Sequence, residues 1–250
     1  MRAYGTLVRR ELGAFFVSWT GYVIVAAVMF LLGVSFIHLL RSLNGESTPL
    51  PLTLLFYEYL SFWFILIIVA PVITMRSFAL EKSSGTYETL MTTPVGDAQV
   101  VLAKFTATLF FYLILWLPLL PCLLLVRHYT SDPSAFTAGT VASTYLGIVL
   151  LGSVYMAMGV FASAITRSQI SAAMVSLVAG FTLFMCSFLA AVFPAQSEGV
   201  GALVSYVGLM EHMRDFAQGV VDVRPVVFYL SLTTLFLLLT WKVVESRRWK

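Results

Sequence analysis

The chain has 250 residues, of which 60% are hydrophobic and only 11% are charged, and its formal net charge is +3. A water-soluble domain of this size could not bury so much apolar side chain, so the composition excludes a soluble globular protein. We therefore predict an all-α polytopic membrane protein, because apolar segments cross a bilayer as helices.

The first predicted element is an amphipathic helix from Tyr4 to Phe16. Arg9, Arg10 and Glu11 lie mostly off its apolar face. The apolar positions are Tyr4, Leu7, Val8, Leu12 and Phe15. Such a helix lies on a membrane surface. We therefore expect residues 1–18 to precede the first span, with their apolar side chains against lipid or against that span.

Six apolar runs follow, each near the roughly 20 residues that a spanning helix needs. They cover residues 19–40, 54–75, 100–126, 140–165, 170–193 and 226–244. An even number of spans leaves both termini on one side of the membrane. That side holds 11 of the 15 basic residues and the opposite side holds 4. The positive-inside rule therefore predicts that both termini are cytoplasmic.

Residues 76–99 form the only long polar interval between two spans on the side of the termini. Ser83-Ser84-Gly85 interrupts its helical pattern, and Gly85 can cap a short new helix with Glu88 at its third position. Thr93-Pro94 ends that helix. A flexible connection needs no such chemistry. The pattern predicts a rigid element, apolar on one face, that contacts a partner at the membrane surface.

Spans four and five carry small residues at helical spacing. They are Gly152, Gly159 and Ser163 in the fourth span, and Ala172, Ser176 and Gly180 in the fifth. Small side chains let helices approach closely. This spacing indicates either packing within the chain or an interface between subunits.

The outer interval, residues 194–225, contains a second amphipathic helix. Its predicted apolar face is formed by Leu209, Met213, Phe216 and Val220, and Gly219 is a helix stop. Glu211 and His212 are expected on the other faces, where they either contact an outer partner or lie on a solvated surface. The helix would lie at the outer leaflet or fold back between spans.

Several motifs carry a resemblance to a known family. They are Pro71-Val72-Ile73-Thr74-Met75-Arg76, then Glu81 with Gly85-Thr86-Tyr87-Glu88-Thr89-Leu90, and Thr93-Pro94-Val95. Together with the order of surface helix, two spans, loop and four spans, they resemble the ABC-2 type transporter permease family. Leu80 departs from that pattern, in which an acidic residue is expected before Glu81. The run Glu211-His212, Phe216, Gly219, Asp222 and the ending Glu245-Ser246-Arg247-Arg248-Trp249-Lys250 are similar to its gliding-motility-type branch.

The resemblance implies one permease domain over residues 1–250, acting as half of an ATP-driven exporter in a bacterial-type inner (cytoplasmic) membrane. A second copy or a paralogue would complete the dimer, and cytoplasmic ABC ATPase subunits would bind the loop at residues 76–99. The implied ATPase-coupling residues are Glu81, Gly85, Thr86, Tyr87, Glu88, Leu90, Met91 and Pro94. The surface helix would contribute Leu7, Arg9, Arg10 and Leu12, with its arginines near anionic headgroups or the ATPase. The cargo would be a lipid, a glycan or another hydrophobic or amphipathic molecule, and a periplasmic or auxiliary membrane subunit could join the complex.

No catalytic or cofactor motif is found in the sequence. It has no G-x-x-x-x-G-K-[ST] phosphate-binding loop, and the Lys82-Ser83 pair follows Glu81 instead of glycine. ATP and Mg would therefore belong to the partner ATPase, and this chain would not be an enzyme. The three histidines lack metal-ligand spacing, and we expect neither a metal site nor a nucleic-acid partner.

Glu58 is the one acidic residue predicted within a span, near the outer end of the second. Burying a charge in lipid is costly, so Glu58 either serves a transport pathway or lies hydrated at the headgroup level. An ion-coupled carrier or channel is an alternative function, although several mid-span charges or internal repeats would be expected for it. A non-transporting subunit that transmits ATPase motion or anchors a partner is another alternative.

Overall fold

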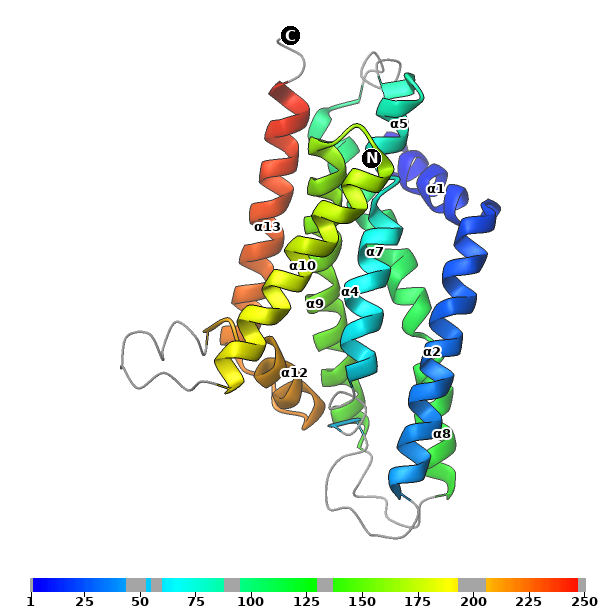
Figure 1. Cartoon of the computed structure of the whole chain (residues 1–250), viewed down its shortest axis with the longest axis vertical. Coiled ribbons are helices and arrows are strands. Elements are labelled where there is room, and N and C mark those ends of the chain that lie inside the picture. The colour runs from blue at the N-terminus through cyan, green and yellow to red at the C-terminus, as the bar shows by residue number, and fades with distance from the viewer. Residues whose placement is uncertain are drawn as a thin grey trace.

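The structure is a computed structural model that describes residues 2–43, 53–54, 60–87, 95–129, 137–192 and 206–246. Among these residues the regular structure is entirely helical (Figure 1). The helices are α1 (Arg2–Val17), α2 (Trp19–Leu43), α4 (Leu60–Thr74), α5 (Ala79–Ser83), α7 (Asp97–Trp116), α8 (Leu119–Tyr129), α9 (Ala138–Ile165), α10 (Gln169–Val192), α12 (Leu209–Ala217) and α13 (Val223–Ser246).

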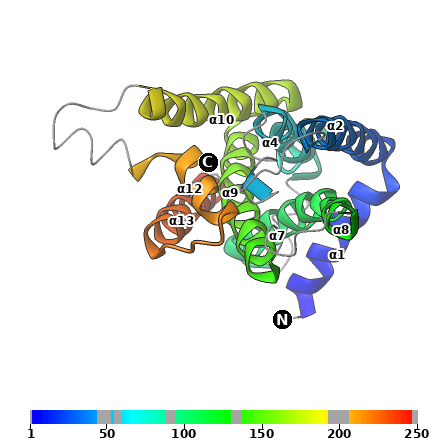
Figure 2. The same ribbon diagram turned by 90° about the horizontal axis from the view of Figure 1, so that it is seen from below.

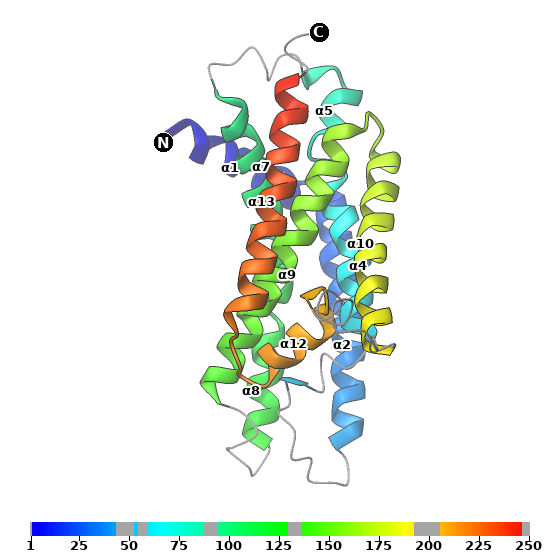
Figure 3. The same ribbon diagram turned by 90° about the vertical axis from the view of Figure 1, so that its left-hand side faces the viewer.

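Six stretches of the described chain are long and apolar enough to cross a membrane, as the sequence predicted. They are Trp19–Arg41, Ser61–Ser83, Asp97–Leu125, Ala138–Ile165, Gln169–Phe188 and Val223–Ser246. The spans run side by side as one bundle (Figures 1 and 3). One end of the bundle, here the α5 end, holds α1, α5, the turn from α9 to α10 and the end of α13. The opposite end, the α12 end, holds α8 and α12.

The third span is bent where α7 passes into α8. Pro118 has no N–H group and cannot continue the helical ladder. The N–H of Leu120 instead bonds the carbonyl of Leu117 at 3.1 Å. The carbonyl of Trp116 accepts a hydrogen bond from the hydroxyl of Tyr145 at 2.9 Å. A side chain from α9 thus satisfies a backbone carbonyl at the bend.

Helix α9 lies at the centre of the bundle (Figure 2). In its apolar stretch 83% of the residues are buried, against 17% in the stretch formed by α13. Glycines in α9 allow the neighbouring helices to pack closely against it. A Cβ atom at Gly152 would lie 2.1 Å from the ring of Tyr112, and one at Gly159 would lie 2.0 Å from the hydroxyl of Thr74. A Cβ at Gly180 would meet the ring of Tyr155 at 2.9 Å. The predicted small-residue positions therefore pack within the chain.

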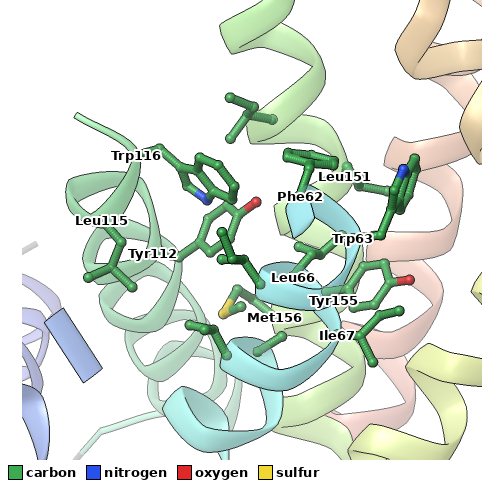
Figure 4. Close-up of a cluster of buried hydrophobic side chains, with 14 of the residues drawn as sticks. Phe62, Trp63, Leu66, Ile67, Tyr112, Leu115, Trp116, Leu151, Tyr155 and Met156 are labelled. Carbon is green, nitrogen blue, oxygen red and sulfur yellow. The ribbon is translucent and has the colours of Figure 1, made fainter. Parts of the chain in front are cut away.

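The core between α4, α7 and α9 is aromatic (Figure 4). The ring of Phe62 lies 5.3 Å from that of Trp63 and 5.2 Å from that of Trp116. The two indoles are only 2% and 1% exposed. Buried aromatic pairs of this kind stabilise a fold beyond the area that they bury, and here they fix α4 against α7.

Helix α1 packs mainly on α7, in the third span, which was not predicted from the sequence, and it also contacts the first span, α2, as expected. The hydroxyl of Tyr4 donates to Thr106 Oγ1 at 3.0 Å, and the ring of Phe15 stacks on Phe111 at 4.7 Å. The helix lies across the spans instead of parallel to them (Figures 1 and 3). An N-terminal segment is thereby joined directly to the third span.

Candidate functional site

The candidate site is the segment from Arg76 to Tyr87 at the α5 end, together with the residues that hold it. Helix α5 ends at Ser83, and Gly85 follows the turn with φ +74°. That backbone conformation is strained for residues with a Cβ atom, so the glycine permits the break that the sequence predicted. Helical geometry resumes at Thr86 and Tyr87. Of the predicted coupling residues, Glu88, Leu90, Met91 and Pro94 lie outside the described residues.

The start of α5 is capped by a residue from another helix. The hydroxyl of Ser163, near the end of α9, accepts hydrogen bonds from the backbone N–H groups of Phe78 at 2.9 Å and Ala79 at 3.0 Å. It also donates to the carbonyl of Met75 at 3.2 Å. The first N–H groups of a helix have no partner inside the helix. Ser163 therefore performs across the fold the role that an N-cap side chain usually performs locally.

The end of α9 is capped in return from α5. The ammonium group of Lys82 donates to the carbonyl of Ala164, and it lies 3.4 Å from the carbonyl of Thr166. A cation at this position also interacts favourably with the negative end of the helix dipole. The two helices thus satisfy each other's free backbone groups. We call this arrangement, made by Ser163 and Lys82, the reciprocal cap.

Tyr87 lies inside the chain. Its side chain is only 8% exposed and packs in a small apolar cluster with Phe78, Val100 and Val244. The rings of Tyr87 and Phe78 meet edge to face at 6.4 Å, and the ammonium of Lys82 lies 5.5 Å from the Tyr87 ring centroid. A partner cannot therefore take up the Tyr87 ring without disturbing this cluster. In this structure Tyr87 anchors the segment to the bundle.

Four charged side chains join α1, α5 and α7. Lys104 of α7 is only 2% exposed, and its Nζ lies 2.7 Å from Glu81 Oε1 and 3.1 Å from Glu11 Oε1. Arg10 Nη2 approaches the same two carboxylate atoms at 2.8 Å for Glu11 and 3.5 Å for Glu81. We call Arg10, Glu11, Glu81 and Lys104 the charge cluster. A buried ammonium needs such compensation, because an unpaired charge in this environment is costly.

The predicted residues of the surface helix lie on different faces. Arg9 and Arg10 are exposed, whereas Leu7 and Leu12 are half-buried. Leu7 packs against the apolar cluster that contains Tyr87. Glu11 was expected to lie away from the packed face, and this was wrong: its carboxylate is directed to Lys104. Helix α1 is therefore part of the same assembly as the candidate segment.

At the α12 end the structure confirms an amphipathic helix and corrects two of its residues. Glu211 is exposed, as predicted, but His212 is only 8% exposed and lies against the rings of Phe228 and Tyr229 at 5.8 and 5.7 Å. His212 thus belongs to the packed face and is not available to an outer partner. Val220 is 54% exposed, because α12 ends at Ala217 before reaching it.

Helix α12 is folded back onto the spans. Its Leu209, Met213 and Phe216 are buried, and the helix contacts α9 and α10. The predicted stop at Gly219 has φ +88°. The other residue proposed for the pathway, Glu58, lies outside the described residues. Within the described ranges no group of three His, Cys, Asp or Glu side chains is placed to hold a metal ion.

Three partners in the site were not predicted from sequence as functional. Lys104 carried a signal, since a lone basic residue at the start of an apolar span is expected to find a buried partner. Ser163 was noted only for its small size, and Lys82 only in a motif search.

His212 lies three residues after Leu209 and four before Phe216, so the helical period places it on the apolar stripe of α12.

Five apolar spans around a buried central one, with a folded polar segment fixed to one end, define a multi-pass helical membrane protein. Comparison with protein families identifies which kind. Residues 25–247 match the family described as ABC-2 family transporter protein. Because the match covers most of the chain, the chain belongs to this family and is a membrane permease component of ABC transporters. A search of curated proteins found no matching sequence.

Family membership has two direct consequences. Permeases of this family are typically transmembrane subunits without catalytic activity, and they associate with ABC ATPase subunits. An ion-coupled carrier or channel is therefore set aside as the function of this chain. The gliding-motility-type branch stays a prediction, because the match is to the ABC-2 family as a whole.

Proposed function

We propose that this chain is the permease subunit of an ATP-driven exporter, and that its α5 end receives the motion of the ATPase. ATP and Mg bind to the separate ATPase chain, and this chain needs no cofactor of its own. The cargo is a lipid, a glycan or another hydrophobic or amphipathic molecule. The whole chain, residues 1–250, acts as one permease domain.

The observation that carries this proposal is the reciprocal cap. Ser163 and Lys82 tie the start of α5 to the end of α9 through buried or half-buried hydrogen bonds. Losing one of them would leave buried backbone groups unsatisfied, at a cost of about 1–3 kcal/mol each. A displacement of α5 therefore moves the end of α9 with it. Since α9 contacts α4, α7, α10, α12 and α13, the displacement reaches four of the other five spans directly.

The charge cluster extends this rigid unit to α1 and α7. Glu81 is committed to Lys104 and Arg10 within the chain, so its role in coupling is to hold α5 in place. Tyr87 has the same role through its apolar cluster. The direct contacts to the ATPase are then assigned to Gly85 and Thr86, which are exposed, and to Glu88, Leu90 and Met91 in the predicted short helix that Pro94 ends. Arg9 and Arg10 supply basic side chains beside them.

The distribution of basic residues supports the orientation. The side that holds the termini and the α5 end carries 11 of the 15 Lys and Arg residues, so we place it in the cytoplasm and the protein in a bacterial-type cytoplasmic membrane. A second copy or a paralogous permease forms the other half of the transporter. At the opposite end Glu211 is exposed and available to an auxiliary or periplasmic subunit.

The test is whether ATP moves the bundle through the reciprocal cap. Nitroxide labels are attached at Phe30→Cys on α2 and Val220→Cys beyond α12, both exposed positions, after Cys122 and Cys186 are replaced by Ala. The distance between the labels is measured in liposomes that contain the co-purified ATPase, with and without ATP and vanadate. We expect a nucleotide-dependent change that Ser163→Ala abolishes while the ATPase stays bound.

Ser231→Ala is the matched control, because the Ser231 hydroxyl is exposed and bonds only the carbonyl of Val227 in its own helix. If the distance between the labels in the chain with Ser163 intact is the same with and without nucleotide, the proposed coupling is contradicted. A nucleotide-dependent change without ATP-driven movement of any lipid or glycan added to the vesicles favours the non-transporting subunit.

A further inference from the structure

A cavity lies between α1 and the candidate segment. Its volume is about 510 Å³, and it is lined by Arg10, Phe15, Arg76, Leu80, Glu81 and Lys104, among others. Its charged lining, which also includes Glu11, has three basic side chains and two acidic ones. The excess of one positive charge favours a ligand that carries a negative group.

Two side chains of the lining have hydrogen-bonding capacity that the described residues do not use. Glu81 Oε1 accepts from Lys104, but Glu81 Oε2 is buried and has no hydrogen-bond partner among the described residues. Arg76 uses Nη1 to donate to Ser18 Oγ at 2.9 Å and to Thr20 Oγ1. Its other guanidinium N–H groups bond to no described residue. Buried polar groups normally have partners, so the unpaired Oε2 of Glu81 is an acceptor that a ligand in the cavity can use. The half-buried Arg76 adds a planar group of donors.

The position of the cavity indicates where its ligand comes from. Arg76 is hydrogen-bonded to the corner between α1 and α2, and at this corner Val17 and Trp19 are each 86% exposed. Phe16 beside them is 42% exposed. Exposed tryptophan and neighbouring apolar side chains lie at the boundary between headgroups and acyl chains. Phe15 and Leu80 give the cavity an apolar wall on which the start of an acyl chain can pack.

We propose that the cavity binds the headgroup of a membrane phospholipid whose phosphodiester is followed by a hydrogen-bond donor, as in phosphatidylethanolamine or phosphatidylglycerol. The phosphodiester pairs with Arg76 and Arg10, since guanidinium groups match phosphate geometry. The ammonium or hydroxyl donor bonds to Glu81 Oε2. The lipid bridges α1 to α5 at the edge of the bundle where α1 lies (Figure 2).

The experiment compares phospholipids on the full-length chain purified in detergent and stripped of lipid. Binding is measured by native mass spectrometry and by the shift in melting temperature. Phosphatidylcholine has the same phosphodiester as phosphatidylethanolamine, but its quaternary ammonium has no N–H donor. Because a hydrogen bond to a charged group is lost, phosphatidylcholine should bind about tenfold more weakly. The phosphatidylglycerol arm tells whether a hydroxyl donor suffices, and a preference over phosphatidylcholine by either lipid supports the proposal.

Two variants assign the binding to named groups. Glu81→Gln keeps an oxygen for Lys104 and turns an amide donor toward the cavity, so it should abolish the preference over phosphatidylcholine. Arg76→Gln should weaken binding of all three lipids about tenfold, while Arg167→Gln, at an exposed position between α9 and α10, should not. Equal binding of all three lipids to the unmodified chain overturns the proposal, as does equal binding by the Arg76 and Arg167 variants. If soluble glycerophosphoethanolamine stabilises the chain as much as phosphatidylethanolamine does, the acyl chains are not needed. The ligand would then be a soluble phosphodiester and not a membrane lipid.

Discussion

The hydroxyl of Ser163 accepts a hydrogen bond from the backbone N–H of Phe78 at 2.9 Å, across 85 positions of the chain. Ser163 stands near the end of the central helix, and Phe78 immediately precedes the short helix α5. A side chain of the fourth span is thus bonded to the backbone of the polar segment that follows the second span.

Ser163→Ala should lower the stability of the permease by about 1–3 kcal/mol, because it leaves the buried N–H groups of Phe78 and Ala79 without an acceptor. Amide hydrogen exchange should become faster at these two residues, and the melting temperature in detergent should fall. Ser231→Ala should change neither quantity. Unchanged exchange at residues 78–79 would show that the cap is not formed.

Lys104→Met should destabilise the chain by about 3–5 kcal/mol, since Glu11 and Glu81 would share a confined space without their central cation. Adding Glu81→Gln to that variant should recover part of the loss. Lys242→Met is the control, because the pair of Lys242 with Glu245 is exposed and worth at most about 1 kcal/mol. Equal melting temperatures for the Lys104 and Lys242 variants would contradict the charge cluster.

Tyr87→Ala and Leu90→Ala should separate folding from partner binding. Removing the buried ring of Tyr87 leaves a cavity, with an expected loss of about 3 kcal/mol or more in stability. Leu90→Ala should leave the melting temperature unchanged and weaken retention of the ATPase in a pull-down, as truncation of an interface anchor does. A Leu90 variant that binds and couples normally would remove the predicted short helix from the coupling contact.

The stability of the α12 end should depend on pH through His212. Burial lowers the pKa of the His212 imidazole below its ordinary value of 6.5, although the nearby carboxylates of Asp215 and Asp222 act in the opposite direction. Below pH 6.5 the unfolded chain binds a proton that the folded chain resists. The stability that depends on neutral His212 is therefore fully present above pH 6.5, and it is lost as the pH falls through the lowered pKa of the folded chain.

This pH dependence is measured as the melting temperature between about pH 7.5 and 5.5, a range that spans the ordinary histidine pKa. His212→Gln should flatten the acid side of the curve. A curve for the His212 variant that is parallel to the unmodified one would assign the pH dependence to other groups.

Cysteines introduced at Ser84 and Ser246 should be labelled only from the cytoplasmic side of sealed cells, and one at Ser197 only from outside. Ser84 and Ser246 are exposed at the same end of the bundle, so they must agree with each other whatever the orientation. The measurement uses a membrane-impermeant maleimide after Cys122 and Cys186 have been replaced. Labelling of Ser84 from outside would reverse the proposed orientation.

Much of the local structure could be predicted from the sequence because it depends on neighbouring residues. The breaks at Gly85 and Gly219 lie where the backbone adopts positive φ, and glycine is the residue that tolerates it. The face of α12 was predicted only in part. Val220 follows the apolar spacing but lies beyond the helix end, and His212 satisfies the same spacing although it is polar.

The sequence by itself determined the class of protein, the number of spans and the two amphipathic helices. These follow from the length and period of the apolar runs, because each run by itself specifies one helix that crosses or lies on the bilayer. Only the tertiary structure decided that α9 is central, that α1 joins α7, and that Lys104 meets Glu11, 93 positions away. Such pairings depend on how whole helices pack against one another, and no local pattern of residues specifies which polar groups that packing brings together.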